Sequence, residues 1–249
     1  MKESAARLDI AIPTIYEDQA VLAVDKPRNI HVHSTKLSCG ESSVQAVLEQ
    51  RLEERIYPVH RLDRPVSGIL LMAKNAESAS KLGIAFRTRG CVEKSYLCVV
   101  RGWLSSAGSF DRPLRQAPGK PLRDAQTSYR VLARAEAPWS DGIFPTSRYS
   151  LLECTAETGR FHQIRRHLAR GSHPVIGDVA HGDNPRNRIW LRETGIDCLL
   201  LRSHRLCFIH PGSEKRITLY APPSPQFIGA AKILGWPLNL VTNSSSQIL

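Results

Sequence analysis

A carboxylate stands between two arginines in one short segment of the chain. Residues 60–64 read His-Arg-Leu-Asp-Arg, so that Asp63 lies between Arg61 and Arg64. Pro65 disfavours helix at the residue before it, and the apolar run Ile69–Ala73 follows a Ser-Gly turn and predicts a buried strand. An ionised carboxylate on such a loop could act as a nucleophile or a general base. Taken alone, the segment favours a structural ion pair over catalysis.

A second segment is strongly basic. Four arginines and three histidines fall between Arg160 and His173 with no acidic residue among them. Phe161, Ile164 and Leu168 have helical spacing. Positive charge concentrated in this way favours an anion, which could be RNA phosphate, Asp63, or both. The alternative is a solvated basic helix face.

A tyrosine and several histidines complete the candidate chemistry. Tyr96 enters a predicted strand, where it could fill the core or stack on a nucleobase, an interaction of about 1–3 kcal/mol. His31 and His33, or His60 beside Asp63, could suggest a metal, but neither pair has a clear third ligand, and nearby arginines would repel a cation. The sequence contains no phosphate-binding glycine motif. We therefore predict no metal and no cofactor.

Charge and composition point to a polyanionic partner. The chain has 249 residues, a net charge of +11 and a pI near 9.7, which favours binding to nucleic acid. Its six cysteines form no C-x-x-C pair, as expected for free thiols in a reducing compartment. The N-terminus lacks the apolar run of a signal peptide, and Ile69–Ala73 is too short to span a bilayer. We expect a cytoplasmic protein, with no membrane partner, that is a monomer.

The elements that must position these residues are mixed in type. Helices are predicted from Ser42, capped with Gln45, to about Arg55, and from Asn75 to Arg89. A surface loop is predicted over Ser105–Pro121. Strands are predicted at Val21–Val24, Tyr96–Val100, Tyr149–Thr155, Leu199–Leu201, Leu206–Ile209 and Ile217–Tyr220. Without a regular βαβ rhythm, the pattern indicates an α+β fold with a mainly antiparallel or mixed sheet. We expect one catalytic domain over residues 1–237 and a flexible tail over 238–249.

At these segments the chain resembles the RluA family of pseudouridine synthases. The matching motifs are His60-Arg61-Leu62-Asp63 with Ser67-Gly68, Lys94-x-Tyr96, Thr158-Gly159-Arg160-x-His162-Gln163-Ile164-Arg165 with Gly177-Asp178, and Asp25-Lys26-Pro27 with His31-Val32-His33. The resemblance implies a central, mostly antiparallel mixed sheet flanked by helices, with a cleft for RNA. It implies that Asp63 is the catalytic aspartate, that Tyr96 stacks on the target uracil, and that Arg165 pairs with Asp63.

The same resemblance implies the partner and its contacts. A finer similarity, including Arg64-Pro65, Arg101-Gly102-Trp103 and His181-Gly182-Asp183, points to the branch of the family that modifies tRNA, at uridine 65 near the T-stem and acceptor stem. No separate S4 RNA-binding domain is expected. The residues expected to bind RNA are His60, Arg61, Arg64, Arg160, His162, Gln163 and Arg166. Three alternatives stay open: a synthase for ribosomal RNA, a non-catalytic RNA-binding module of the same fold, and a metal-dependent hydrolase using His60 and Asp63.

Overall fold

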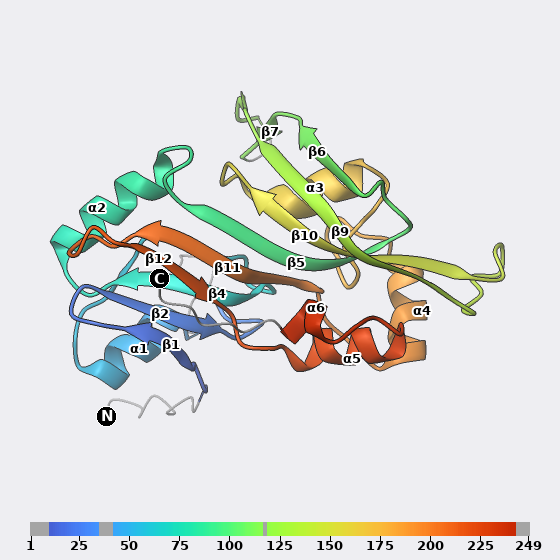
Figure 1. The fold of residues 1–249 in the computed structure, drawn as a ribbon, viewed down its shortest axis with the longest axis horizontal. Helices are drawn as coiled ribbons and strands as arrows, with labels where there is room; N and C mark the ends of the chain where they lie inside the picture. Colours follow the sequence, from blue (N-terminus) through green and yellow to red (C-terminus); the bar gives the residue numbers. More distant parts are fainter. Residues whose placement is uncertain (1–9, 35–41, 117–118, 243–249) are drawn as a thin grey trace.

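The structure is a computed structural model that describes residues 10–34, 42–116 and 119–242. A ten-stranded sheet crosses the molecule in the order β1-β2-β4-β11-β5-β10-β9-β6, with β12 paired to β11 and β3 to β4, while β7 and β8 form a separate ribbon (Figure 1). The strands are β1 (Thr14–Glu17), β2 (Val21–Lys26), β3 (Tyr57–Pro58), β4 (Ser67–Ala73), β5 (Glu93–Arg101), β6 (Ala107–Asp111), β7 (Leu114–Arg115), β8 (Leu122–Arg123), β9 (Gln126–Ala137), β10 (Ser147–Ala156), β11 (Leu201–Ile209) and β12 (Arg216–Tyr220). The helices are α1 (Val44–Leu52), α2 (Ala76–Arg87), α3 (Gln163–Arg170), α4 (Asn184–Thr194), α5 (Pro225–Ile233) and α6 (Asn239–Thr242).

Neighbouring strands pair antiparallel except β4 and β11, which run parallel at Ser67↔Arg202 and Gly68↔Ser203. These two strands approach each other closely at Gly68, whose φ is +108°. A Cβ atom added to Gly68 would lie 2.1 Å from the carbonyl oxygen of Ser203. Only glycine fits such a position. This contact fixes the start of β4, directly after the Asp63 loop. The predicted α+β class with a mostly antiparallel mixed sheet is confirmed.

Strand β4 is buried on both faces, which explains its unbroken apolar sequence. Ile69 and Leu71 share a hydrophobic cluster with Leu82 of α2. Leu70 and Met72 pack in another cluster with Leu48 of α1. In Figure 1 these two helices lie at one end of the sheet, while α4, α5 and α6 gather at the other. Apolar packing on both faces therefore makes β4 a rigid base for the loop that precedes it.

The described residues of the stretch Ser105–Pro121 are mostly exposed, as predicted, but the stretch is not a loop throughout, because β6 and β7 lie within it. Strand β6 has Gly and Asp in its sequence, residues that are depleted in strands. It forms by pairing with β9, for example through Phe110↔Thr127. The sequence did not predict β9 either, since its mixed polar residues show no clean alternation. Pairing between distant segments outweighs local preference here.

The two helices predicted in the first half of the chain are present as α1 and α2, with shifted ends. Asn75 caps α2 as expected, with its side chain accepting a hydrogen bond from the backbone N–H of Ser78. Helix α1 is capped by Ser43 rather than Ser42, and it ends at Leu52 because Glu53 adopts a left-handed conformation (φ 54°). The two strands predicted around residues 199–209 are one strand, β11, with an irregularity beside Ser203.

Three further expectations concern ends, thiols and membranes. The range 238–249 begins with the short helix α6, whose Val241 is buried, and residues 243–249 lie outside the described residues. The five cysteines within the described ranges are free, while Cys39 falls outside them. No helix in the described part of the chain is long and apolar enough to cross a bilayer.

Candidate active site

Asp63 lies in the loop between β3 and β4, and contacts on both sides of this residue hold the loop in place. Its carbonyl oxygen accepts a hydrogen bond from the backbone N–H of Val66 at 3.0 Å, closing a turn, and the preceding Leu62 is buried in the core. The carboxylate is 18% exposed and borders a cavity of about 270 Å³. A loop held by the fold thus presents a charged group to a cavity, which is where catalytic groups are commonly found.

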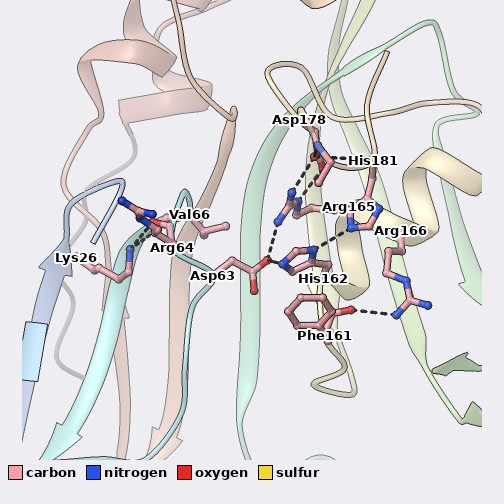
Figure 2. Close-up of polar contacts among 11 residues, drawn as sticks. Lys26, Asp63, Arg64, Val66, Phe161, His162, Arg165, Arg166, Asp178 and His181 are labelled. Carbon is pink, nitrogen blue, oxygen red and sulfur yellow. Dashed lines mark hydrogen bonds and ion pairs between the residues drawn. The ribbon is translucent and has the colours of Figure 1, made fainter. Parts of the chain in front are cut away.

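Arg165 of α3 fixes this carboxylate from the other side of the cavity. Its Nη1 donates to Asp63 Oδ2 at 3.2 Å, while Nε and Nη2 donate to Asp178 at 2.7 and 2.8 Å (Figure 2). Burial opposes the charge on Arg165, but the hydrogen bonds and charge of Asp178, and then those of Asp63, raise its pKa. Burial likewise opposes the charge on Asp178, yet Arg165 and nearby backbone N–H groups lower its pKa. The predicted Asp63–Arg165 pair is present in the structure, and Asp178 orients it.

His162 also approaches Asp63. Its Nε2 lies 3.6 Å from Asp63 Oδ2, and its Nδ1 is 2.8 Å from Nε2 of His181. The backbone of His162 is left-handed (φ 52°), an uncommon conformation for a residue that is not glycine. The ring of Phe161 stacks on the imidazole ring of His162, with 3.7 Å between the ring centroids. Burial is the main reason that its pKa falls to about 4, against the pull of Asp63. At neutral pH the imidazole is therefore uncharged.

Tyr96 completes the cavity wall from β5. It is placed opposite Cys154 of β10 and Ser203 of β11, so the middle of the sheet holds its backbone on both sides. Burial, reinforced by the charge of Asp63, raises the pKa of Tyr96 well above its ordinary value. Its hydroxyl group therefore stays protonated, and its ring faces the same cavity as Asp63 and Arg165. The structure brings all three predicted catalytic residues together.

The residues expected to bind RNA separate into two groups. Arg61 is exposed and Arg160 is partly buried; both line the cavity, and the Nε of Arg160 donates to the carbonyl of Asp124. Arg166 donates to the carbonyls of Arg115 and Phe161, which ties α3 to the β7–β8 ribbon. For these three residues, contact with RNA stays a prediction.

Three other expected RNA contacts, His60, Gln163 and Arg64, bond to other parts of the protein. His60 Nε2 accepts a hydrogen bond from Leu71 N–H, and its ring stacks on Phe86 at 4.5 Å. Burial, and then the charge of Lys94, lowers the pKa of His60 to about 3. Gln163 is buried and bonds to Thr158, Gln126 and Thr127. Arg64 donates to the carbonyl of Asn29 and does not line the cavity. For these residues the observed contacts are structural, and their RNA contacts stay predictions.

The sequence did not single out Lys26 as a site residue. It is fully buried, and its Nζ donates to the carbonyls of Pro27, Arg64 and Val66 at 2.9, 3.1 and 2.7 Å. Burial lowers the pKa of Lys26 to about 7, although Asp63 and Asp25 oppose this shift. In Figure 2 the side chain of Lys26 lies beside Arg64 and Val66, on the side of Asp63 away from Arg165. Lys26 therefore holds the segment that follows the carboxylate.

Lys26→Met should loosen this segment, because it keeps the apolar stem and removes every donor. We expect the free energy of unfolding to fall by about 1–3 kcal/mol, the usual effect of leaving buried carbonyls unsatisfied. Urea denaturation measures this change. Lys81→Met is the matched control, since Lys81 is exposed and contacts Glu77 and Pro211 at the surface. A change within ~0.5 kcal/mol is expected there, and an equal loss in both variants would contradict the role of Lys26.

Within the described residues, no group of three His, Cys, Asp or Glu side chains converges in a way that could hold a metal ion. The arrangement places one carboxylate in contact with a buried arginine, beside a half-buried tyrosine. That combination suits nucleophilic or general-base chemistry on a flat, uncharged ring.

Comparisons with known proteins agree with this geometry. A family model described as RNA pseudouridylate synthase matches residues 20–170, a range that includes Asp63, Tyr96 and Arg165. The tRNA pseudouridine synthase C of Pasteurella multocida is 37% identical over 243 residues, covering 93% of this chain and 100% of the relative. The protein of the same name from Vibrio vulnificus is 35% identical, covering 92% and 98%. Among solved structures, Human RNA Pseudouridylate Synthase Domain Containing 4 has a TM-score of 0.67 at 21% identity, covering 90% of this chain and 93% of that one.

Proposed function

The chain belongs to the RNA pseudouridylate synthase family, and from this membership we propose that it converts a uridine of tRNA to pseudouridine with Asp63 as the catalytic carboxylate. The observation that carries the proposal is the contact between Asp63 and Arg165 at the wall of a cavity that also contains Tyr96. A non-catalytic RNA-binding module would have no need to orient Arg165 through a second, buried carboxylate.

The reaction explains why these groups suffice. The N1–C1′ bond of uridine breaks and a C5–C1′ bond forms, so no atoms are gained and no electrons leave. Within a stem the target atoms are hidden, and the nucleotide must be flipped out at a cost of a few kcal/mol. The positive charge of the protein offsets this cost by binding the backbone. Arg61 enters the space that the base leaves; its exposure and its position in the cavity lining support this role.

Each catalytic residue then has one role. Asp63 acts on the sugar or the base while Arg165 stabilises its charge. Tyr96, kept protonated by burial, stacks on the uracil ring. Arg160, which lines the cavity, and Arg166 on α3, both partly buried, contact phosphates.

The choice of tRNA rests on the relatives, which carry the name tRNA pseudouridine synthase C. We propose uridine 65 as the target by resemblance. Ribosomal RNA is the second candidate. A cytoplasmic location and a monomeric state stay predictions from the sequence.

Release of tritium from uridine labelled at C5 tests the activity, because C5 loses its hydrogen only when the new bond forms there. Bulk tRNA and bulk ribosomal RNA are incubated in parallel with the protein. We expect release from tRNA alone, and mapping of pseudouridine in the product gives its position. Release from ribosomal RNA alone would make ribosomal RNA the substrate in place of tRNA. Release from neither RNA would overturn the proposed function.

A further inference from the structure

The proposed reaction leaves one proton without an acceptor. After C5 joins C1′, C5 carries both the sugar and its original hydrogen. That hydrogen must leave as a proton before the conjugated ring is restored. Asp63, Tyr96 and Arg165 are assigned to other tasks, so a further base is required near the ring. The following inference rests on the proposed function.

Most polar groups at the cavity wall cannot serve as this base. Arginine and lysine side chains there are donors. Tyr96 is kept protonated by burial. His60 uses Nε2 to accept the backbone N–H of Leu71, so its lone pair is occupied. Among the described residues that line the cavity, the imidazole of His162 remains as an uncharged group that can accept a proton.

The geometry of His162 suits this task. His162 lines the cavity, and its Nε2 is 3.6 Å from Asp63 Oδ2, which is longer than a hydrogen bond, so this nitrogen is not committed to the carboxylate. The left-handed backbone and the stacked ring of Phe161 fix the direction of the imidazole. An imidazolium formed here would be stabilised by Asp63, while Arg165 lies near enough to oppose it. The ring can therefore accept a proton briefly without retaining it.

His181 extends the arrangement away from the cavity. It stands in the loop after Asp178, and its backbone N–H donates to Asp178 Oδ1 at 3.0 Å. Its Nε2 lies 2.8 Å from Nδ1 of His162, and the two rings meet edge to face. His181 is only partly buried and does not line the cavity. Figure 2 shows the sequence Asp63, His162, His181 running from the carboxylate outward.

We propose that His162 removes the C5 proton and that His181 carries it to solvent. The C5–H bond breaks, and its electron pair forms the C5–C6 double bond. The C6–N1 double bond returns its pair to N1, which takes a proton from solvent. At the protein, Nε2 of His162 gains the C5 proton as Nδ1 passes its own to Nε2 of His181. The Nδ1 proton of His181 leaves, so one proton departs and one arrives. His162 is thus a catalytic residue, and His181 acts through it.

Two substitutions separate proton transfer from positioning. His181→Gln keeps a hydrogen-bond acceptor toward Nδ1 of His162 but cannot relay a proton, whereas His181→Phe removes both properties. His162→Asn removes the base with a residue that tolerates left-handed backbone. His204→Gln is the matched control, because His204 is a half-buried histidine that does not line the cavity.

The measurement is the rate of pseudouridine formation in a single turnover, with substrate carrying hydrogen or deuterium at C5. We expect His162→Asn to be slower by about 10²–10⁴-fold, the range of general-base catalysis. His181→Gln should be slower by about tenfold or more, and both variants should show a larger deuterium effect than the wild type because proton removal limits their rate. His204→Gln should match the wild type in both respects.

Other outcomes would overturn the relay. If His181→Gln keeps the wild-type rate while His181→Phe is slow, then His181 only positions His162. If the variants are slow with an unchanged deuterium effect, the loss lies in another step. An inactive wild type would instead contradict the proposed function, and this distinguishes the two failures.

Discussion

Asp63→Asn is expected to abolish pseudouridine formation, with a loss of at least about a thousand-fold. A loss of this size is within the range seen when a nucleophile or general base is removed. The substitution keeps the shape of the side chain and removes its charge. Both contacts of the carboxylate use Oδ2, and Figure 2 shows the other oxygen turned away from Arg165 and His162. This second oxygen is available to the substrate, so the loss should fall on chemistry rather than on RNA binding.

We expect Asp63→Asn to fold normally, because its buried neighbour Arg165 keeps another partner. Arg165 keeps its two hydrogen bonds to Asp178, so no buried charge is left without a partner. Asp63 itself is 18% exposed. We therefore expect the urea midpoint and the affinity for tRNA to stay close to those of the wild type. Tritium release, urea denaturation and filter binding measure the three quantities.

A matched control is Asp197→Asn, the same chemical change at an exposed aspartate far along the chain. It should leave tritium release unchanged. Retained activity in Asp63→Asn would remove Asp63 from the mechanism. Loss of folding in that variant would show that its carboxylate is structural, which is the interpretation that the isolated segment favoured.

The sequence predicted the parts of the site that local pattern encodes. The turn residues after Asp63 and the helical spacing around Arg165 are local signals, and the structure places both segments as expected. The basic segment also predicted an anion near Arg165, and Asp63 lies there. Which anion it would be could not be decided from the spacing alone.

The supporting residues depend on distant partners, which local pattern does not encode. Lys26 bonds to carbonyls of residues 64 and 66, far along the chain. His60 and Gln163 lie inside motifs where exposure to RNA was expected, yet packing directs both inward. His181 could be singled out from sequence only as a motif residue, since its contact with His162 is created by the loop after Asp178. Burial and pairing across the sheet decided these cases.

Arg165→Ala is expected to reduce both stability and activity, because Arg165 serves two carboxylates. Arg165 is 4% exposed and Asp178 is 1% exposed. The substitution leaves the charge of Asp178 with only backbone N–H donors from Ala180 and His181. Breaking a buried ion pair by removing one partner costs about 3–5 kcal/mol, and urea denaturation should show a loss of that order. Tritium release should fall as well, since Asp63 loses the group that orients it.

Arg165→Lys separates charge from geometry. A lysine keeps the positive charge, but its single ammonium cannot reproduce the fork that spans Asp178 and Asp63. We therefore expect a smaller loss of stability than in Arg165→Ala, with activity still well below the wild type. Full activity in Arg165→Lys would mean that only charge matters at this position.

The pH dependence gives an independent check on the same pair. The pKa of Asp178 is lowered in the folded protein, so the stability gained from its pairing is present above the ordinary aspartate pKa of about 4. That stability is lost as the pH falls through the lowered value. Arg165→Ala lacks this contribution at every pH. The difference in unfolding free energy between wild type and Arg165→Ala should therefore be constant near neutral pH and should shrink below about pH 4. A difference that stays constant into acid would show that Arg165 stabilises the fold by packing rather than by its charge.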